Sequence, residues 1–346
     1  MDLEIKSNKM NKQKVAHIES LRGIAILLVV IGHVIGSTPA GGMKIDYPSF
    51  WRYLYIWIDY IQLPLFTGIA GWAYAIKPAI NSEFKTFVYK KAIRLLIPMA
   101  TVGTLYFITQ YLTPGTNMKG NLSDIWKIYI FPYTIYWYLP SLFLILIIMY
   151  IIDKFKLCQS VKTWLFLFVI TWGISLIIKA LPSDIPNLFS YKGALGQLPY
   201  FITGVGIQRF TGQLYKKKAI YIYFILTCIG LTLLQYKWFY VLNFGVDISF
   251  WYKALLPLWT ASTLMLLLHI NRSNQFFTWL GGFAYTIYLF HGFGTSGGRI
   301  MATKLGINSS LFIVIMATII ALFLPIVIEK IANKWRATKI LFLGKK

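Results

Sequence analysis

The chain has 346 residues, of which 57% are hydrophobic and only 13% are charged. Charged residues normally make up about a quarter of a soluble domain, so this composition excludes a soluble enzyme, a disordered chain and a fibrous protein. Basic residues outnumber acidic ones by 34 to 11, for a net charge of +23. In a chain this apolar, we interpret the excess as a signal of membrane topology rather than of nucleic-acid binding.

The apolar stretches predict an all-α integral membrane protein with about ten transmembrane helices in a single domain, residues 1–346. The first stretch follows a basic segment, as in a signal peptide, but it contains Arg22 and His33 and ends in no Ala-x-Ala cleavage pattern. We therefore expect it to be retained as the first helix. Loop-forming Pro, Gly and Asn residues separate the stretches. The helices are expected at 18–37, 54–76, 92–112, 133–153, 163–180, 193–210, 219–236, 250–270, 277–296 and 309–332.

The basic residues test this count and orient the chain. With the N-terminus in the cytoplasm, 24 of the 34 Lys and Arg residues fall on the predicted cytoplasmic side, whereas the 11 acidic residues divide six to five. This asymmetry of Lys and Arg alone is the one that the positive-inside rule describes. It predicts that both termini are cytoplasmic, with an N-terminal segment at 1–17 and a tail at 333–346. Cys158 and Cys228 fall in different segments and predict no disulfide framework.

The first helix carries two ionisable side chains, Arg22 and His33, and such groups inside a membrane helix suggest function by default. Eleven residues are close to three helical turns, so the two lie on one face about 16 Å apart. Glu19 stands one turn before Arg22, where an ion pair can form. The alternatives are an interfacial Arg22 that extends to water and a His33 bonded to a loop or to water. Because Arg22 and His33 lie on the same polar face, we favour a cavity that both side chains line.

The second and third helices add further candidates. Asp59 lies at a depth similar to that of His33, and a carboxylate bonded to an imidazole would orient it and raise its basicity; the alternative is that Asp59 marks the end of the helix at water. Lys91 and Arg94 are one turn apart at the cytoplasmic end of the third helix and could hold phosphates. From the sequence alone, ordinary positive-inside charges explain that pair better.

Other chemistries lack their signatures. The chain has no Gly-rich phosphate loop, no His-Glu-x-x-His motif and no Gly-x-Ser-x-Gly elbow. Four His and two Cys residues are scattered along it, so we predict no metal site. His291, near the outer end of the ninth predicted helix, is by itself more typical of a structural residue than of a catalytic one.

Several motifs together resemble the acyltransferase 3 family of membrane acyltransferases. Residues 18–25 followed by His33 resemble its opening signature, an Arg and a His separated by ten residues. Residues 64–72 resemble its second-helix motif, with Ala70 where Ser is usual. Lys91 and Arg94 resemble its Arg-x-x-Arg pair, with Lys at the first position, so that position offers a point charge rather than a bidentate fork. Residues 137–139 and 287–291 resemble its fourth-helix and late-helix motifs.

The resemblance implies an enzyme of the bacterial cytoplasmic membrane that moves an acyl group, commonly acetyl from acetyl-CoA, to a hydroxyl of a cell-surface glycan or its lipid-linked precursor. Acyl-CoA is then a donor substrate, and no permanently bound cofactor is expected. His33 would act as general base with Asp59 orienting it. The donor would be held by Arg22, Lys91 and Arg94, whereas the remaining pocket residues would be Glu19, Trp137, Tyr138 and His291.

Two other functions fit the same sequence. A transporter or flippase of a polysaccharide or lipid-linked glycan also needs many helices and no soluble domain, and a scaffold subunit of a polysaccharide synthase would show no activity without its partners. We favour the enzyme, because Arg22 and His33 on one face have a role in transfer and no obvious role in passive transport. Succinyl or another short acyl donor, direct transfer or an acyl-enzyme, and a homo-oligomer all stay open.

Overall fold

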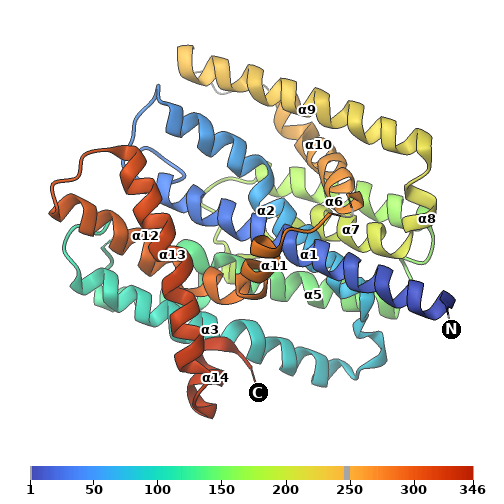
Figure 1. Ribbon diagram of the computed structural model, residues 1–346, viewed down its shortest axis with the longest axis horizontal. Coiled ribbons are helices and arrows are strands. Elements are labelled where there is room, and N and C mark those ends of the chain that lie inside the picture. The colour runs from blue at the N-terminus through green and yellow to red at the C-terminus, as the bar shows by residue number, and fades with distance from the viewer. Residues whose placement is uncertain (1, 118, 245–249, 271, 346) are drawn as a thin grey trace.

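The computed structural model describes the chain except residues 1, 118, 245–249, 271 and 346 (Figure 1). In the described part, helices joined by short loops make up the fold, with no strand. The α-helices are α1 (Asp2–Ile35), α2 (Phe50–Ile76), α3 (Phe84–Leu112), α4 (Lys127–Ile130), α5 (Tyr138–Lys154), α6 (Val161–Ala180), α7 (Tyr191–Arg209), α8 (Thr211–Leu214), α9 (Lys217–Phe244), α10 (Phe250–His269), α11 (Gln275–Gly282), α12 (Ala284–Lys304), α13 (Ser310–Ala332) and α14 (Arg336–Leu343). Short 3₁₀ turns lie at Ala79–Asn81, Leu122–Asp124, Thr134–Trp137 and Leu188–Ser190.

Each of the ten predicted segments overlaps helix in the structure, but α3 begins at Phe84 rather than at residue 92, and α9 ends at Phe244 rather than at residue 236. Three further differences change the pattern of helices. The first helix begins at Asp2 rather than at residue 18, so it includes the predicted N-terminal segment except Met1, which lies outside the described residues. The ninth predicted helix is two helices, because the chain turns at Phe283 after two glycines. The predicted tail contains a further helix, α14, and its last residue, Lys346, is not described.

Within the described residues, six helical segments are long and apolar enough to cross a membrane. They are Val15–Ile35, Phe84–Leu112, Leu122–Lys154, Val161–Ala180, Lys217–Tyr236 and Ser310–Ala332. Helices α2, α7 and α12 are similarly long but richer in Gly and polar residues. The larger total of ten spans and the cytoplasmic position of the termini therefore stay predictions. Large apolar side chains on the outside of α13, such as Leu311, Ile315 and Ile319, are exposed one turn apart, as lipid-facing side chains are.

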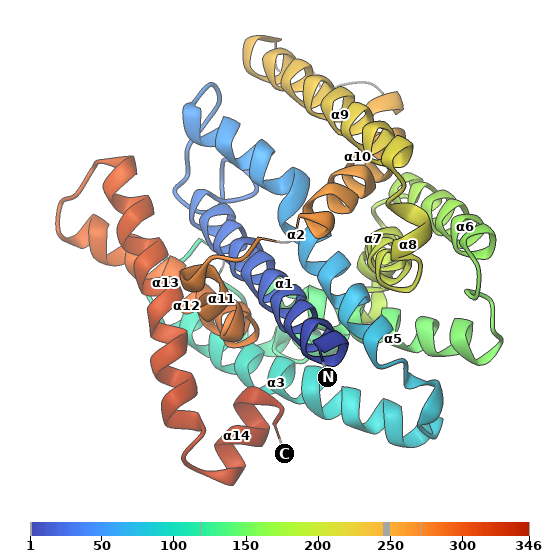
Figure 2. The same ribbon diagram turned by 45° about the vertical axis from the view of Figure 1, so that its right-hand side comes forward.

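Helix α1 runs through the middle of the bundle and packs against α2, α11, α12 and α13 (Figure 2). Its closest contact is with α11, where Gly23 and Gly281 face the partner backbone. A Cβ at Gly23 would come within 2.0 Å of the Phe277 carbonyl oxygen, and one at Gly281 within 2.0 Å of the Glu19 carbonyl oxygen. Only glycine allows this approach. Helices α6 and α9 lie at the edge of the bundle (Figure 1).

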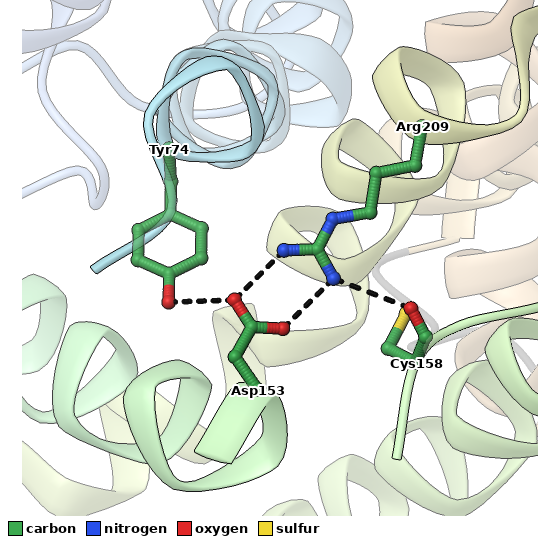
Figure 3. Close-up of polar contacts among 4 residues, drawn as sticks. All are labelled: Tyr74, Asp153, Cys158 and Arg209. Atoms are coloured by element: carbon green, nitrogen blue, oxygen red, sulfur yellow. Dashed lines mark hydrogen bonds and ion pairs between the residues drawn. The ribbon is translucent and has the colours of Figure 1, made fainter. Parts of the chain in front are cut away.

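A buried ion pair joins α5 to α7 (Figure 3). Arg209 donates from Nη1 to Asp153 Oδ1 at 2.8 Å and from Nη2 to Oδ2 at 2.7 Å, the bidentate geometry that Arg favours. The Tyr74 hydroxyl of α2 donates to the same carboxylate at 2.9 Å, and Arg209 Nη1 also reaches the Cys158 carbonyl oxygen. Three helices meet at this one carboxylate, which is 7% exposed. The loss of its charge would leave the largely buried guanidinium of Arg209, 17% exposed, without its ion-pair partner.

We therefore predict that Asp153→Asn lowers the free energy of unfolding by about 3–5 kcal/mol, the usual cost of breaking a buried pair from one side. The measurement is unfolding of the detergent-solubilised protein by titration with sodium dodecyl sulfate. Asp124→Asn is the matched control, because Asp124 and Lys127 form an exposed pair that is expected to contribute less than about 1 kcal/mol. Equal losses in the two variants would refute a special role for the α5–α7 pair.

Candidate active site

A cavity of about 660 Å³, here called the basic cavity, opens among the middle of α1, the end of α2, the start of α3 and the α11–α12 junction. Five basic side chains line it, and no Asp or Glu is among the described lining residues: Arg22, Lys77, Lys90, Lys91 and Arg94. Its remaining wall is largely apolar, with Phe66, Ile69 and Leu146 among the lining residues. Such a site suits a ligand with several negative charges and an apolar or extended part.

Neighbouring groups hold the two arginines of the basic cavity in place. Arg22 Nη1 donates to both oxygens of Glu19, at 2.8 and 3.0 Å, which is the pair predicted from their spacing. Arg94 places its guanidinium carbon 3.8 Å from the centre of the Tyr285 ring, a cation–π contact. Its Nη1 also donates to the Leu343 carbonyl oxygen at 2.5 Å. Lys91 has a weaker support, because its Nζ lies 5.6 Å from the Phe87 ring centre.

A second cavity of about 340 Å³, here called the histidine cavity, lies at the C-terminal end of α1. It is lined by His33, by the loop at 37–42 and by polar side chains of α3 and α12, among them Gln110 and Ser296. Arg299 is the one Lys, Arg, Asp or Glu among its described lining residues. Asn117 Oδ1 and Thr134 Oγ1, both on lining residues, are buried without a hydrogen-bond partner in the described part of the chain. Unpaired buried oxygens of this kind are costly unless a ligand or water satisfies them.

His33 and His291 form a pair beside this cavity. Their ring centroids are 5.0 Å apart, with His291 fully buried and His33 exposed to the cavity. His291 Nδ1 lies 2.8 Å from the Tyr288 carbonyl oxygen and 3.1 Å from that of Ile287. These acceptors assign the proton to Nδ1. Nε2 is then a free acceptor, and it has no partner among the described residues.

A buried arginine fixes the end of α1 next to His33. Arg52 of α2, which is 0% exposed, donates to the carbonyl oxygens of Ile35 at 2.7 Å and Gly36 at 2.9 Å. The last carbonyl groups of a helix have no hydrogen-bond partner within the helix, and they carry its partial negative charge. A cation at this position donates hydrogen bonds to these carbonyl oxygens and offsets that charge. In the sequence, Arg52 is only one of the ten basic residues that fall on the predicted outer side.

Aromatic rings connect the two cavities. Phe66 lines the basic cavity, and its ring centroid lies 6.0 Å from that of Tyr138 and 6.3 Å from that of Tyr288. Tyr138 and Tyr288 are 5.8 Å apart, and Tyr288 is in turn 5.9 Å from His291. The Tyr288 hydroxyl donates to the carbonyl oxygen of Ile135, a residue that lines the histidine cavity. These ring contacts form a continuous chain from the basic cavity to His291, beside the histidine cavity.

The structure separates some of the residues that the sequence grouped. Arg22 and His33 share α1, as expected, but they line two cavities instead of one. No hydrogen bond joins Asp59 to His33 in the described part of the chain. Asp59 is exposed, and its Oδ1 accepts from Gln62 Nε2 at 3.1 Å and from the Tyr55 hydroxyl at 3.3 Å. Trp137 packs against Gly193 of α7 and is not among the described residues that line either cavity.

Other site residues escaped sequence reasoning. Lys77 and Lys90 belong to the same basic segment as Lys91 and had been counted only for topology, although their clustering was a usable signal. Asn117 lies in a Pro- and Gly-rich loop that has no recognisable motif. Asp153 and Arg209 are 56 residues apart in the sequence, and nothing in the pattern pairs them.

Comparison with known proteins agrees with this architecture. The model of a family described as an acyltransferase domain matches residues 15–330, nearly the whole chain. No curated protein and no solved structure gives a significant match. The matched region includes α1 with Arg22 and His33, both cavities and the late helices with Tyr285 and His291. Together with the apolar helices, the match indicates a multi-pass membrane protein with acyltransferase function, and the chain belongs to the acyltransferase 3 family.

Proposed function

We propose that the protein transfers an acyl group, acetyl in the first instance, from acyl-CoA to a hydroxyl of a cell-surface glycan or its lipid-linked precursor. The observation that carries this proposal is the pair of cavities, one beside the middle of α1 and one at its C-terminal end. One offers five basic side chains to a polyanion, whereas the other offers His33, neutral polar groups and one arginine, Arg299, to a sugar. We place the protein in a bacterial cytoplasmic membrane, with the basic cavity on the cytoplasmic side.

The basic cavity suits the nucleotide end of the donor. CoA is a long molecule with phosphates at one end and a thioester at the other. Arg22, Arg94 and the three lysines supply charge for the phosphates, with the arginines able to make bidentate contacts. The thioester arm would then extend past Phe66 toward His33, which lies about 16 Å farther along α1 by helical rise.

His33 is the proposed general base. Its neutral imidazole takes the proton of the acceptor hydroxyl as that oxygen attacks the thioester carbon. The carbon–sulfur bond then breaks, an ester bond forms, and the proton passes from the imidazolium to the CoA thiolate. The ring of His291 lies beside that of His33, with their centroids 5.0 Å apart, and its Nε2 stays free to accept a hydrogen bond because two carbonyl oxygens hold the Nδ1 proton. We assign to His291 the assisting role that the resemblance implies for Asp59.

The histidine cavity is the proposed acceptor site. Sugar hydroxyls both donate and accept hydrogen bonds, and the cavity supplies uncharged partners of both kinds, including Gln110 and Ser296. The unpaired oxygens of Asn117 and Thr134 are acceptors for two such hydroxyls. No carboxylate is among the described lining residues, so a glycan with acidic sugars meets no like charge there.

His33→Ala is predicted to lower the rate of transfer by about 10²–10⁴-fold, the usual contribution of a positioned base. Free CoA release from acetyl-CoA and a glycan acceptor measures the rate, and binding of CoA should be unchanged. The matched control is His269→Ala, because His269 is exposed and stacks on Tyr215 at 4.3 Å, outside both cavities. Turnover at the wild-type rate in His33→Ala would remove His33 from the mechanism.

Arg22→Ala is predicted to raise the dissociation constant for CoA about tenfold or more, because a lost charge-assisted contact costs about 1.5–3 kcal/mol. Calorimetric titration of the purified protein measures this constant. The control is Arg272→Ala, which removes an exposed arginine that lines neither cavity among the described residues. If both variants bind CoA as the wild type does, the basic cavity is not the donor site.

A further inference from the structure

The C-terminal helix α14 contacts the donor-site arginine directly, although it lies beyond the residues that match the acyltransferase family. α14 packs against α3 and α13 at one side of the bundle (Figures 1 and 2). At its end, Leu343 is fully buried, and the Leu343 carbonyl oxygen accepts the Arg94 Nη1 hydrogen bond at 2.5 Å. Helix α14, which lies outside the matched region, thus accepts one N–H group of Arg94, whose guanidinium lines the basic cavity.

The backbone fit between this segment and α3 is close. Gly344 has a φ of +58°, and a Cβ there would come within 2.6 Å of the Arg94 carbonyl oxygen. Glycine is therefore required by both conformation and space. The same Arg94 carbonyl oxygen accepts a hydrogen bond from the Tyr285 hydroxyl, and the Thr101 hydroxyl donates to the Leu341 carbonyl oxygen. Arg94 is consequently held at its backbone and at its guanidinium.

An ion pair anchors the segment after Gly344. Lys345 Nζ lies 2.5 Å from Glu329 Oε1 of α13, and the Thr286 hydroxyl of α12 donates to the other oxygen of that carboxylate. Glu329 is 7% exposed, and its side chain is buried beside that of Lys345, which stays one-third exposed. A buried carboxylate without its cation would be strongly unfavourable, so Lys345 holds the end of the chain against α13.

We propose that residues 336–345 form a positioning element of the donor site, which orients Arg94 toward the phosphates of acyl-CoA. Fixing the guanidinium in advance removes the entropy that a free side chain would lose on binding. The Tyr285 ring stacks on one face of the Arg94 guanidinium, and the Leu343 carbonyl oxygen accepts one of its N–H groups. The remaining N–H donors of Arg94 are then left for a ligand in the basic cavity. This inference rests on the proposed function, because it assigns the cavity to an acyl-CoA.

The test measures binding of CoA by calorimetry to the purified full-length protein and its variants. Lys345→Gln is expected to raise the dissociation constant about tenfold, the loss of roughly one charge-assisted contact, with Lys345→Arg close to the wild type. Lys334→Gln, which removes an exposed lysine from the α13–α14 turn, is the matched control and should bind as the wild type does. A chain ending at Asn333 should lose at least as much affinity as Lys345→Gln.

A double-mutant cycle separates positioning from general stability. If the segment acts through Arg94, Lys345→Gln causes no further loss of affinity in an Arg94→Ala background. Additive losses, unchanged binding by both Lys345→Gln and the shortened chain, or tighter binding by either would overturn the inference while leaving the donor site intact. Tighter binding would mean that the Leu343 carbonyl competes with phosphate. Failure of the wild type itself to bind CoA would overturn the proposed donor, and this inference with it.

Discussion

One continuous helix sets the distance between the two parts of the site. α1 carries Arg22 and His33 eleven residues apart, and the rise of an α-helix places them on one face about 16 Å apart. The contact between Gly23 and Gly281 holds the middle of α1, next to Arg22, against α11, whereas Arg52 binds the carbonyl oxygens of Ile35 and Gly36 at the end next to His33. The helix is thus held next to both residues, and the remaining site residues are arranged around it.

The two cavities differ in charge because the helices around α1 bring different side chains to its middle and to its C-terminal end. The start of α3 and the end of α2 supply lysines and an arginine, whereas the end of α3 and the second half of α12 supply amides, hydroxyls and one arginine. Between them, Phe66, Tyr138 and Tyr288 form an apolar boundary. Under the proposed function, the charged nucleotide would stay on one side of this boundary, and only the uncharged end of the donor would pass it.

Sequence reasoning succeeded where the signal was local. The helix periodicity and the positions of the apolar stretches gave the helical segments, and the three-residue spacing gave the Glu19–Arg22 pair that the structure confirms. The late-helix motif also identified His291 from the sequence. The contact of His291 with His33, however, depends on how α12 crosses α1. The family, too, was recognisable from short motifs, and the family match confirms it.

Contacts between segments far apart in the chain could not be predicted from the sequence. Asp59 was selected for its depth in the membrane, but depth does not fix the direction of a side chain around the helix axis, and its carboxylate bonds to its own helix. The Asp153–Arg209 pair and the docking of Leu343 on Arg94 join residues far apart in the chain. The tail had read as a simple cytoplasmic segment because eight residues of α14 are too few to give a clear periodic pattern.

The most direct test of the account uses purified protein in sealed proteoliposomes of known orientation. Acetyl-CoA with a ¹³C-labelled acetyl group is supplied on the side of the basic cavity, and the de-O-acylated surface polysaccharide of the cells that make this protein is supplied on the other. Mass spectrometry then follows the glycan while free CoA is assayed. The account predicts a labelled acetyl ester on the glycan and an equal amount of CoA on the donor side. An unmodified glycan that crosses the membrane without CoA release would contradict it and indicate a transporter.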